Sequence, residues 1–161
     1  MVTTETFPNI IGQDSAKRVL DFFCNGFEQT KVMPHLMFVA PKGCGKTTMA
    51  KAVARRLKSI DSDKRYFEIN CSTIKNVKQF FNQIVIPLCQ DRDATILFDE
   101  CSEIPKDVSM ALLTILNPNP DNMTSFTLED YTVDFDFRRL SFMFATTETQ
   151  SVFHALMDRL E

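Results

Sequence analysis

The segment from Ala40 to Thr48 could bind phosphate. It reads APKGCGKTT and matches the P-loop pattern G-x-x-x-x-G-K-[ST], with Ala40 in place of the first glycine. A glycine-rich loop that opens a helix can turn backbone N–H groups around a polyphosphate. We expect Lys46 to reach the β- and γ-phosphates of ATP and Thr47 to offer its hydroxyl to Mg²⁺. The residues predicted to contact the nucleotide here are Pro41, Lys42, Gly43, Cys44, Gly45, Lys46, Thr47 and Thr48.

A second motif, Ile96-Leu-Phe-Asp-Glu100, is an apolar run that ends in two carboxylates. This pattern is typical of a Walker B strand, in which Asp99 holds Mg²⁺ directly or through water. Glu100 then orients and polarises the attacking water. The alternative is a charged strand end that faces solvent, but a P-loop earlier in the chain favours the catalytic interpretation.

Strands and helices must alternate to bring these motifs together. Short apolar runs predict buried strands at 36–40, 66–70, 94–98 and 140–145. Apolar residues at helical spacing predict helices over 14–27, 47–57, 77–88 (ending near Pro87), 105–116 and from 152 to 160. This order predicts a single α/β domain, 1–161, with a mostly parallel sheet between layers of helices.

A breaker, Asn117-Pro-Asn-Pro-Asp-Asn122, is followed by strict alternation of apolar and polar residues. This alternation predicts a half-buried β-hairpin inserted at about 123–137, with an acidic turn at Glu129-Asp130. A sheet extension with a solvated face and a docking element for a protein partner are both compatible with the pattern.

Composition limits the classes of function. The chain has 161 residues, 44% hydrophobic and 24% charged, with a net charge of −3, as expected for one globular domain. No apolar run approaches the roughly 20 residues of a membrane span, and residues 1–8 do not resemble a signal peptide, so we expect a cytoplasmic protein without membrane contact. Five cysteines and two histidines without a C-x-x-C pair argue against zinc and disulfides. Cys44 is expected to be a small filler, with a redox-sensitive thiol as the alternative.

Taken in order, the motifs resemble the ATPase core of the AAA+ superfamily, in particular the branch that holds clamp-loader subunits and RuvB-type branch-migration motors. Besides the P-loop and the carboxylate pair, the resemblance rests on segments 7–13 (FPNIIGQ), 33–40 (MPHLMFVA), 68–72 (EINCS) and 145–148 (ATTE). It implies a three-layer P-loop fold with a mostly parallel five-stranded sheet. The motif of the family's helical lid is not found after Arg159, which is expected either of a truncated chain or of a reduced core, and we expect weak turnover without a lid.

The resemblance also implies roles for single residues. Ile10 and Ile11 match the segment that packs on adenine, although they could instead staple the following helix. Thr147 matches sensor 1, which contacts the γ-phosphate or its water, with Thr146 as the neighbour to test beside it. Arg159 matches the arginine finger that reaches the next subunit's site, with an ordinary surface arginine as the alternative.

We therefore expect Mg²⁺-dependent ATP hydrolysis in a homo- or hetero-oligomeric ring. DNA is the expected substrate, in branch migration first and clamp loading second, with Lys75 and Lys78 as candidates for a pore loop. A protein-remodelling ATPase, docking its partner at hairpin 123–137, and a non-catalytic ATP-binding subunit are the alternatives. The intact Lys46, Asp99, Glu100 and Thr147 argue against the last of these.

Overall fold

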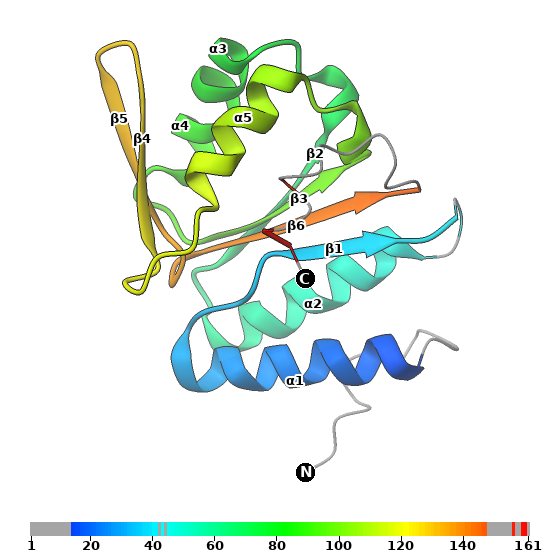
Figure 1. Cartoon of the computed structure of the whole chain (residues 1–161). Coiled ribbons are helices and arrows are strands. Elements are labelled where there is room, and N and C mark those ends of the chain that lie inside the picture. Colours follow the sequence, from blue (N-terminus) through cyan, green and yellow to red (C-terminus); the bar gives the residue numbers. More distant parts are fainter. Residues whose placement is uncertain (1–13, 42, 44, 148–155, 157–158, 161) are drawn as a thin grey trace.

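The computed structural model describes residues 14–41, 43, 45–147, 156 and 159–160. At its centre is a parallel sheet of β1 (Leu36–Val39), β2 (Arg65–Asn70), β3 (Ala94–Asp99) and β6 (Leu140–Thr146). The strand order is β1-β6-β3-β2 (Figure 1). The described residues thus form four parallel strands, one fewer than expected from the family. These are the four apolar runs that the sequence itself offers.

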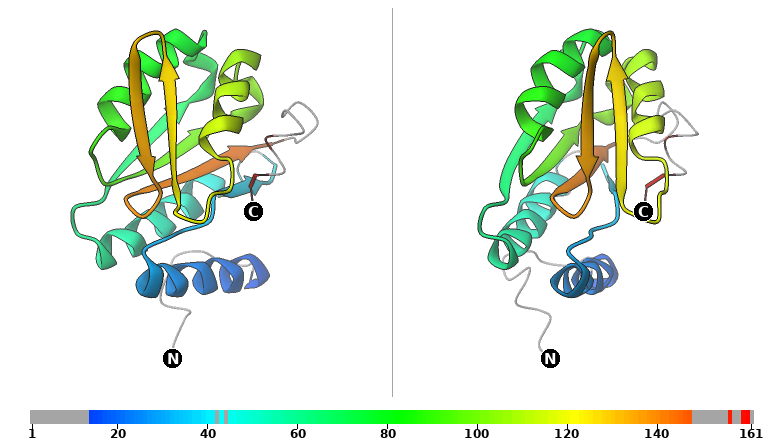
Figure 2. Two further views of the ribbon diagram at one scale, coloured as in Figure 1. Left: turned by 60° about the vertical axis from the view of Figure 1, so that its left-hand side comes forward. Right: turned by 90° about the vertical axis from the view of Figure 1, so that its left-hand side faces the viewer.

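Helices cover both faces of this sheet and confirm the three-layer fold. Helices α1 (Asp14–Thr30) and α2 (Lys46–Ile60) lie on one face. Helix α5 (Lys106–Ile115) and the short α3 (Val77–Phe80) and α4 (Ile86–Cys89) lie on the other (Figures 1 and 2). Short 3₁₀ turns at Cys71–Thr73 and Cys101–Glu103 follow β2 and β3.

The central strands are buried on both sides, which explains their continuous apolar runs. Because side chains alternate along a strand, Leu97 packs in the core under α1 and α2, whereas its neighbours Ile96 and Phe98 pack in the core under α3–α5. In β6, Phe142 and Phe144 face the second core and Met143 faces the first. The rings of Phe98 and Phe144 stack with centroids 5.0 Å apart.

The segment expected as one helix over 77–88 is helical throughout but changes its winding. Between α3 and α4, residues Phe81–Val85 form a π-helix. Pro87 follows directly, within the first turn of α4. Proline lacks an N–H and clashes with the carbonyl four residues earlier in a regular helix, and a wider π turn before it accommodates this ring.

The predicted hairpin is present as a separate two-stranded antiparallel sheet, β4 (Met123–Leu128) and β5 (Tyr131–Asp136). It covers one side of the α3–α5 layer (Figure 2). Val133 and Phe135 are buried on its inner face. At its tip, the Lys78 Nζ lies 3.8 Å from a carboxylate oxygen of Glu129.

The outward-facing positions of the hairpin itself are exposed, and their ionisable side chains are all carboxylates. We call this surface the acidic hairpin face and define it as Ser125, Thr127, Glu129, Asp130, Thr132 and Asp134. None of the helices in the described residues has the length and apolarity needed to cross a membrane.

Candidate nucleotide-binding site

The loop between β1 and α2 has the backbone that its glycines predict. Gly43 and Gly45 have φ values of 84° and 85°, in the left-handed region that costs other residues energy. Gly45 is also the N-cap of α2. The predicted contact residues Lys42 and Cys44 lie outside the described residues. The two described glycines therefore form the turn that leads into α2, as expected of a phosphate-binding loop.

The two carboxylates and the loop, far apart in sequence, line one cavity of about 370 Å³. They meet because β1 and β3 are parallel and lie on either side of β6, so their carboxyl ends share an edge of the sheet. Ligands of open α/β sheets bind at this edge. The cavity is lined by Gly43, Gly45, Lys46, Thr47, Thr48, Asp99 and Glu100.

Lys46 is folded back over the loop. Its Nζ donates a hydrogen bond to the Ala40 carbonyl at 2.7 Å and to the Pro41 carbonyl at 3.3 Å. Both acceptors are neutral, and an ammonium binds an anionic oxygen more strongly than a neutral one. A phosphate oxygen in the cavity can therefore replace the two carbonyls as the hydrogen-bond acceptor of the Lys46 ammonium.

Glu100 has a strained backbone, which the sequence did not reveal. Its φ is 55° and its ψ is 50°, a left-handed conformation that is uncommon outside glycine and asparagine. The Asp99 carboxylate accepts the backbone N–H of Glu100 at 2.9 Å, which helps to hold this turn. Strained backbone is often found at functional sites, and since Glu100 lines the cavity we interpret this turn as placing the second carboxylate there.

The oxygens in this cavity fit a magnesium ion. Mg²⁺ takes oxygen ligands, commonly one or two from the protein beside those of water and phosphate. The Thr47 hydroxyl and the Asp99 carboxylate both line the cavity, and both are half-buried.

Thr146 and Thr147 lie at the end of β6, between the loop and the carboxylates. The Ala40 N–H donates to the Thr146 carbonyl at 3.4 Å, which ties the start of the loop to β6. Thr146 is fully buried, whereas Thr147 is exposed just past the strand. Of the two, Thr147 is the one accessible to a ligand, although it does not line the cavity.

A smaller, mostly apolar cavity of about 180 Å³ adjoins the loop. It shares Gly45 and Lys46 with the phosphate cavity and is otherwise lined by Ala16, Met37, Phe38, Val39, Ala40 and Met49. Apolar walls beside a phosphate site suit a flat base. Ile10 and Ile11, predicted to contact adenine, lie outside the described residues. Sequence reasoning missed Ala16 and Met49 because neither belongs to a motif at the strand end.

Arg159 lies away from this site, in a third cavity of about 200 Å³ that also contains His35. His35 precedes β1, whereas the phosphate loop follows it, so the two cavities are separated by roughly 16 Å of extended strand at about 3.3 Å per residue. Arg159 is half-buried. Arg159 is not among the residues that line the phosphate cavity, and the two cavities share no lining residue.

The four described cysteines are buried free thiols. Burial raises the pKa of Cys24, Cys89 and Cys101 to about 12, and that of Cys71 well above its usual range. Since the thiolate is the reactive form, these side chains act as core residues.

Comparison with known proteins agrees with this geometry. A sequence model of the family "ATPase family associated with various cellular activities (AAA)" matches residues 36–161. The chain belongs to the AAA family. The matched region includes the loop, both carboxylates, the hairpin and Arg159, and AAA proteins of this kind are ATPases.

Two curated relatives and two solved structures illustrate the similarity of this AAA domain. A mitochondrial Lon protease homolog 1 of Dictyostelium discoideum is 28% identical over 167 residues, covering 92% of this chain and 17% of the relative. Replication factor C small subunit 2 of Pyrobaculum arsenaticum is 26% identical over 131 residues, covering 78% of this chain and 39% of the relative.

The solved structures share the fold. The Thermotoga maritima RuvB Holliday junction branch migration motor aligns with a TM-score of 0.70 and 19% identity, over 93% of this chain and 43% of that one. A point mutant of the same RuvB gives a TM-score of 0.73 and 19% identity over 99% of this chain and 47% of that one. The chain thus spans less than half the length of each of these four proteins.

Proposed function

We propose that this AAA domain binds Mg-ATP at the carboxyl end of its sheet and hydrolyses it. The observation that carries the proposal is the single cavity in which Lys46, Thr47, Asp99 and Glu100 meet. A bound Mg²⁺ would neutralise charge on the phosphate oxygens. The family and the cavity support the proposal together.

Each side chain has a part that follows from its chemistry. Lys46 exchanges its bonds with the two loop carbonyls for bonds to phosphate oxygens. Thr47 and Asp99 would hold the metal ion through their hydroxyl and carboxylate oxygens. Glu100, whose backbone is fixed by the N–H bond to Asp99, accepts a proton from the attacking water. Thr147 contacts the γ-phosphate or this water from the end of β6.

We further propose that Arg159 completes the phosphate site of a neighbouring subunit in a ring or spiral. Its separation from the cavity of its own chain supports action in trans. A cation that enters the site from a neighbour stabilises the charge that develops in the transition state, an effect of roughly 10³–10⁵ in other phosphoryl-transfer systems.

A mixing experiment tests this arrangement. Glu100→Gln and Arg159→Ala should each abolish steady-state ATP hydrolysis while nucleotide binding persists. Mixing the two variants should restore activity, because an intact site of the Arg159→Ala chain then receives the arginine of a Glu100→Gln neighbour. In a random one-to-one mixture about a quarter of head-to-tail interfaces have this combination. Failure to recover activity, with mixed oligomers verified, would reject action in trans.

DNA is the first candidate for the substrate on which the motor acts. The RuvB structure is named as a Holliday junction branch migration motor, and replication factor C is named for replication. Lys75 is exposed in the turn after β2, whereas Lys78 is partly neutralised by Glu129. Binding to a four-way junction that weakens steeply with salt, and weakens uniformly in Lys75→Ala, would support a DNA motor. The clamp-loader alternative predicts stimulation by a primed template instead.

A protein substrate is the second candidate, and the acidic hairpin face favours it. Glu129, Asp130 and Asp134 repel a phosphate backbone and can attract a basic protein segment. ATPase activity that responds to an unfolded basic protein but not to DNA, and loses this response in Asp134→Lys, would favour protein remodelling. With four buried free thiols, a reducing compartment such as the cytoplasm is proposed for either activity.

A further inference from the structure

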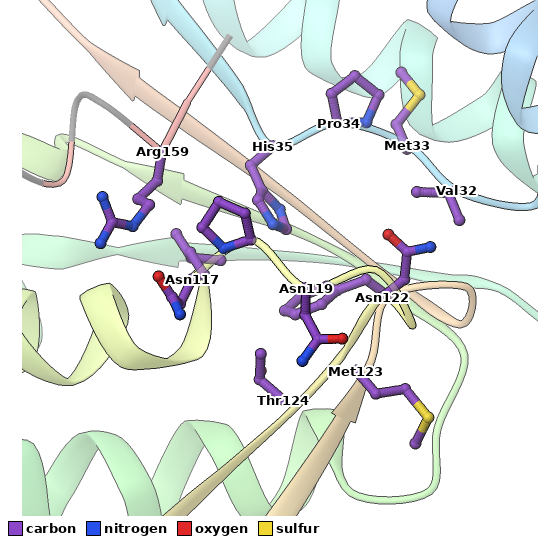
Figure 3. A pocket seen from close by; sticks show the side chains of 13 residues that line it. Val32, Met33, Pro34, His35, Asn117, Asn119, Asn122, Met123, Thr124 and Arg159 are labelled. Carbon is purple, nitrogen blue, oxygen red and sulfur yellow. The ribbon is translucent and has the colours of Figure 1, made fainter.

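The cavity that contains Arg159 lies at the opposite end of β1 from the phosphate loop. Its walls come from the segment before β1, the turn between α5 and β4, the end of β5, and Arg159 (Figure 3). The turn is well ordered by its own hydrogen bonds: the Asn122 N–H donates to the Asn119 carbonyl at 3.0 Å, and the Asp121 N–H donates to the Asn119 side chain at 2.8 Å. The cavity is therefore a built feature of the fold.

Two buried nitrogen atoms in this cavity have no hydrogen-bond partner among the described residues. They are Nε of Arg159 and Nδ1 of His35. Their capacities are complementary: the arginine Nε–H can only donate, and an imidazole nitrogen that carries no proton can only accept. Burial lowers the pKa of His35 to about 4, so the imidazole is neutral at physiological pH and keeps one such acceptor.

The described surroundings offer Arg159 no charged partner, and the neutral amides of Asn117, Asn119 and Asn122 are other side-chain acceptors that line the cavity. No carboxylate is among the described residues that line the cavity, so Arg159 has no anionic partner there. The side-chain carbonyl of Asn119 is already used by the turn. A buried donor and a buried acceptor that both lack partners are costly, and pairing them removes both costs.

We propose that His35 is a positioning residue for Arg159, with one water in the cavity accepting the Nε–H of the guanidinium and donating to Nδ1 of the imidazole, since the two nitrogens are not hydrogen-bonded to each other. The inference rests on the proposed role of Arg159 in trans. In Figure 3 the terminal guanidinium nitrogens lie on the side away from His35. A hydrogen bond at Nε on the His35 side leaves the two terminal nitrogens of Arg159 available for the phosphate bound by the neighbouring subunit.

The imidazole is itself fixed, which makes it a suitable anchor. Its ring meets Phe137 edge-on at 4.7 Å between centroids and lies 6.3 Å from Phe142 of β6. Phe137 follows β5, and its N–H donates to the Asn122 carbonyl at 2.8 Å. The base of the hairpin therefore orients His35, and through it the arginine that acts on the next subunit.

Two substitutions separate this role from simple packing. His35→Phe keeps a ring against Phe137 but removes the acceptor. His35→Asn restores an acceptor, Oδ1, near the place of Nδ1. In the assembled full chain we expect His35→Phe to lower kcat for ATP roughly 10- to 100-fold, with KM changed by less than about twofold, because a misplaced catalytic group costs this much. His35→Asn should recover most of the loss, which a packing defect would not predict.

A double-mutant cycle with Arg159→Ala completes the test. We expect His35→Phe to have no further effect on kcat once Arg159 is removed. In parallel, the ¹⁵N chemical shift of His35 Nδ1 should change in Arg159→Ala and remain as in wild type in Lys46→Ala, the matched control at the other cavity.

The outcomes distinguish this inference from the proposed function. If Arg159→Ala lowers kcat but His35→Phe does not, or if the two losses multiply, the positioning role is overturned and the trans role stands. If Arg159→Ala leaves kcat unchanged, the trans role and the inference both fail, and the ¹⁵N shift then reports only a structural contact.

Discussion

Glu100 offers a test that joins stability to function at one residue. Its left-handed backbone is costly for a residue with a Cβ, and glycine removes that cost. We therefore expect Glu100→Gly to be more stable than Glu100→Ala. At an ordinary helical position the order is the reverse, because glycine is the poorer helix former.

The magnitude follows from two opposing contributions. The left-handed conformation costs a non-glycine residue roughly 1–2 kcal/mol. Glycine loses about 0.4–1 kcal/mol through the greater entropy of its unfolded chain. With mid-range values of about 1.5 and 0.7 kcal/mol, the glycine variant should be more stable than the alanine variant by about 0.8 kcal/mol, or about 2–3 °C in thermal midpoint for a domain of this size.

Thermal unfolding of both variants measures this difference, and Arg55 supplies the control. Arg55 is exposed in the middle of α2, where Arg55→Ala should be more stable than Arg55→Gly by about 0.8–1 kcal/mol. Both Glu100 variants should bind ATP and fail to hydrolyse it. An alanine variant at least as stable as the glycine variant at position 100 would refute the strain and with it the idea that strain aims this carboxylate.

Three further predictions concern the loop and a buried cation. Gly45→Ala should lower the free energy of unfolding by roughly 1–2 kcal/mol and weaken ATP binding. The cause is the φ of 85° at this position, since the space around a Cβ is open. Chemical denaturation measures the loss of stability, and nucleotide titration measures the loss of affinity. Lys46→Ala should weaken ATP binding at least tenfold in a fluorescent-nucleotide titration, since it removes a charge-assisted hydrogen bond. Lys51 is exposed and lies outside the cavity, so Lys51→Ala should leave ATP binding unchanged. Lys64 is 2% exposed, its Nζ donates to the Arg139 carbonyl at 2.7 Å, and burial lowers its pKa from 10.5 to about 8. Between these pH values the unfolded chain binds more protons, so stability should rise with pH from about 8 to 10.5 relative to Lys64→Met; parallel pH profiles of the two proteins would contradict this.

Much of the site could be predicted from the sequence because its parts are local. The loop from Ala40 to Thr48 needs its glycines at fixed positions, and Gly43 and Gly45 do adopt the left-handed backbone. The apolar run that ends in Asp99 predicts a buried strand, and alternation after Asn122 predicts the hairpin. These are properties of a few consecutive residues, in which spacing alone decides geometry.

The sequence by itself therefore determined the motifs, the alternation of strands and helices, and the AAA family. Only the tertiary structure decided which residues meet. It placed Asp99 beside the loop across β6, set the strained turn of Glu100, and brought His35 and Arg159 into one cavity. Such contacts depend on strand order and packing between residues far apart in the chain, and no local pattern encodes the distance between them.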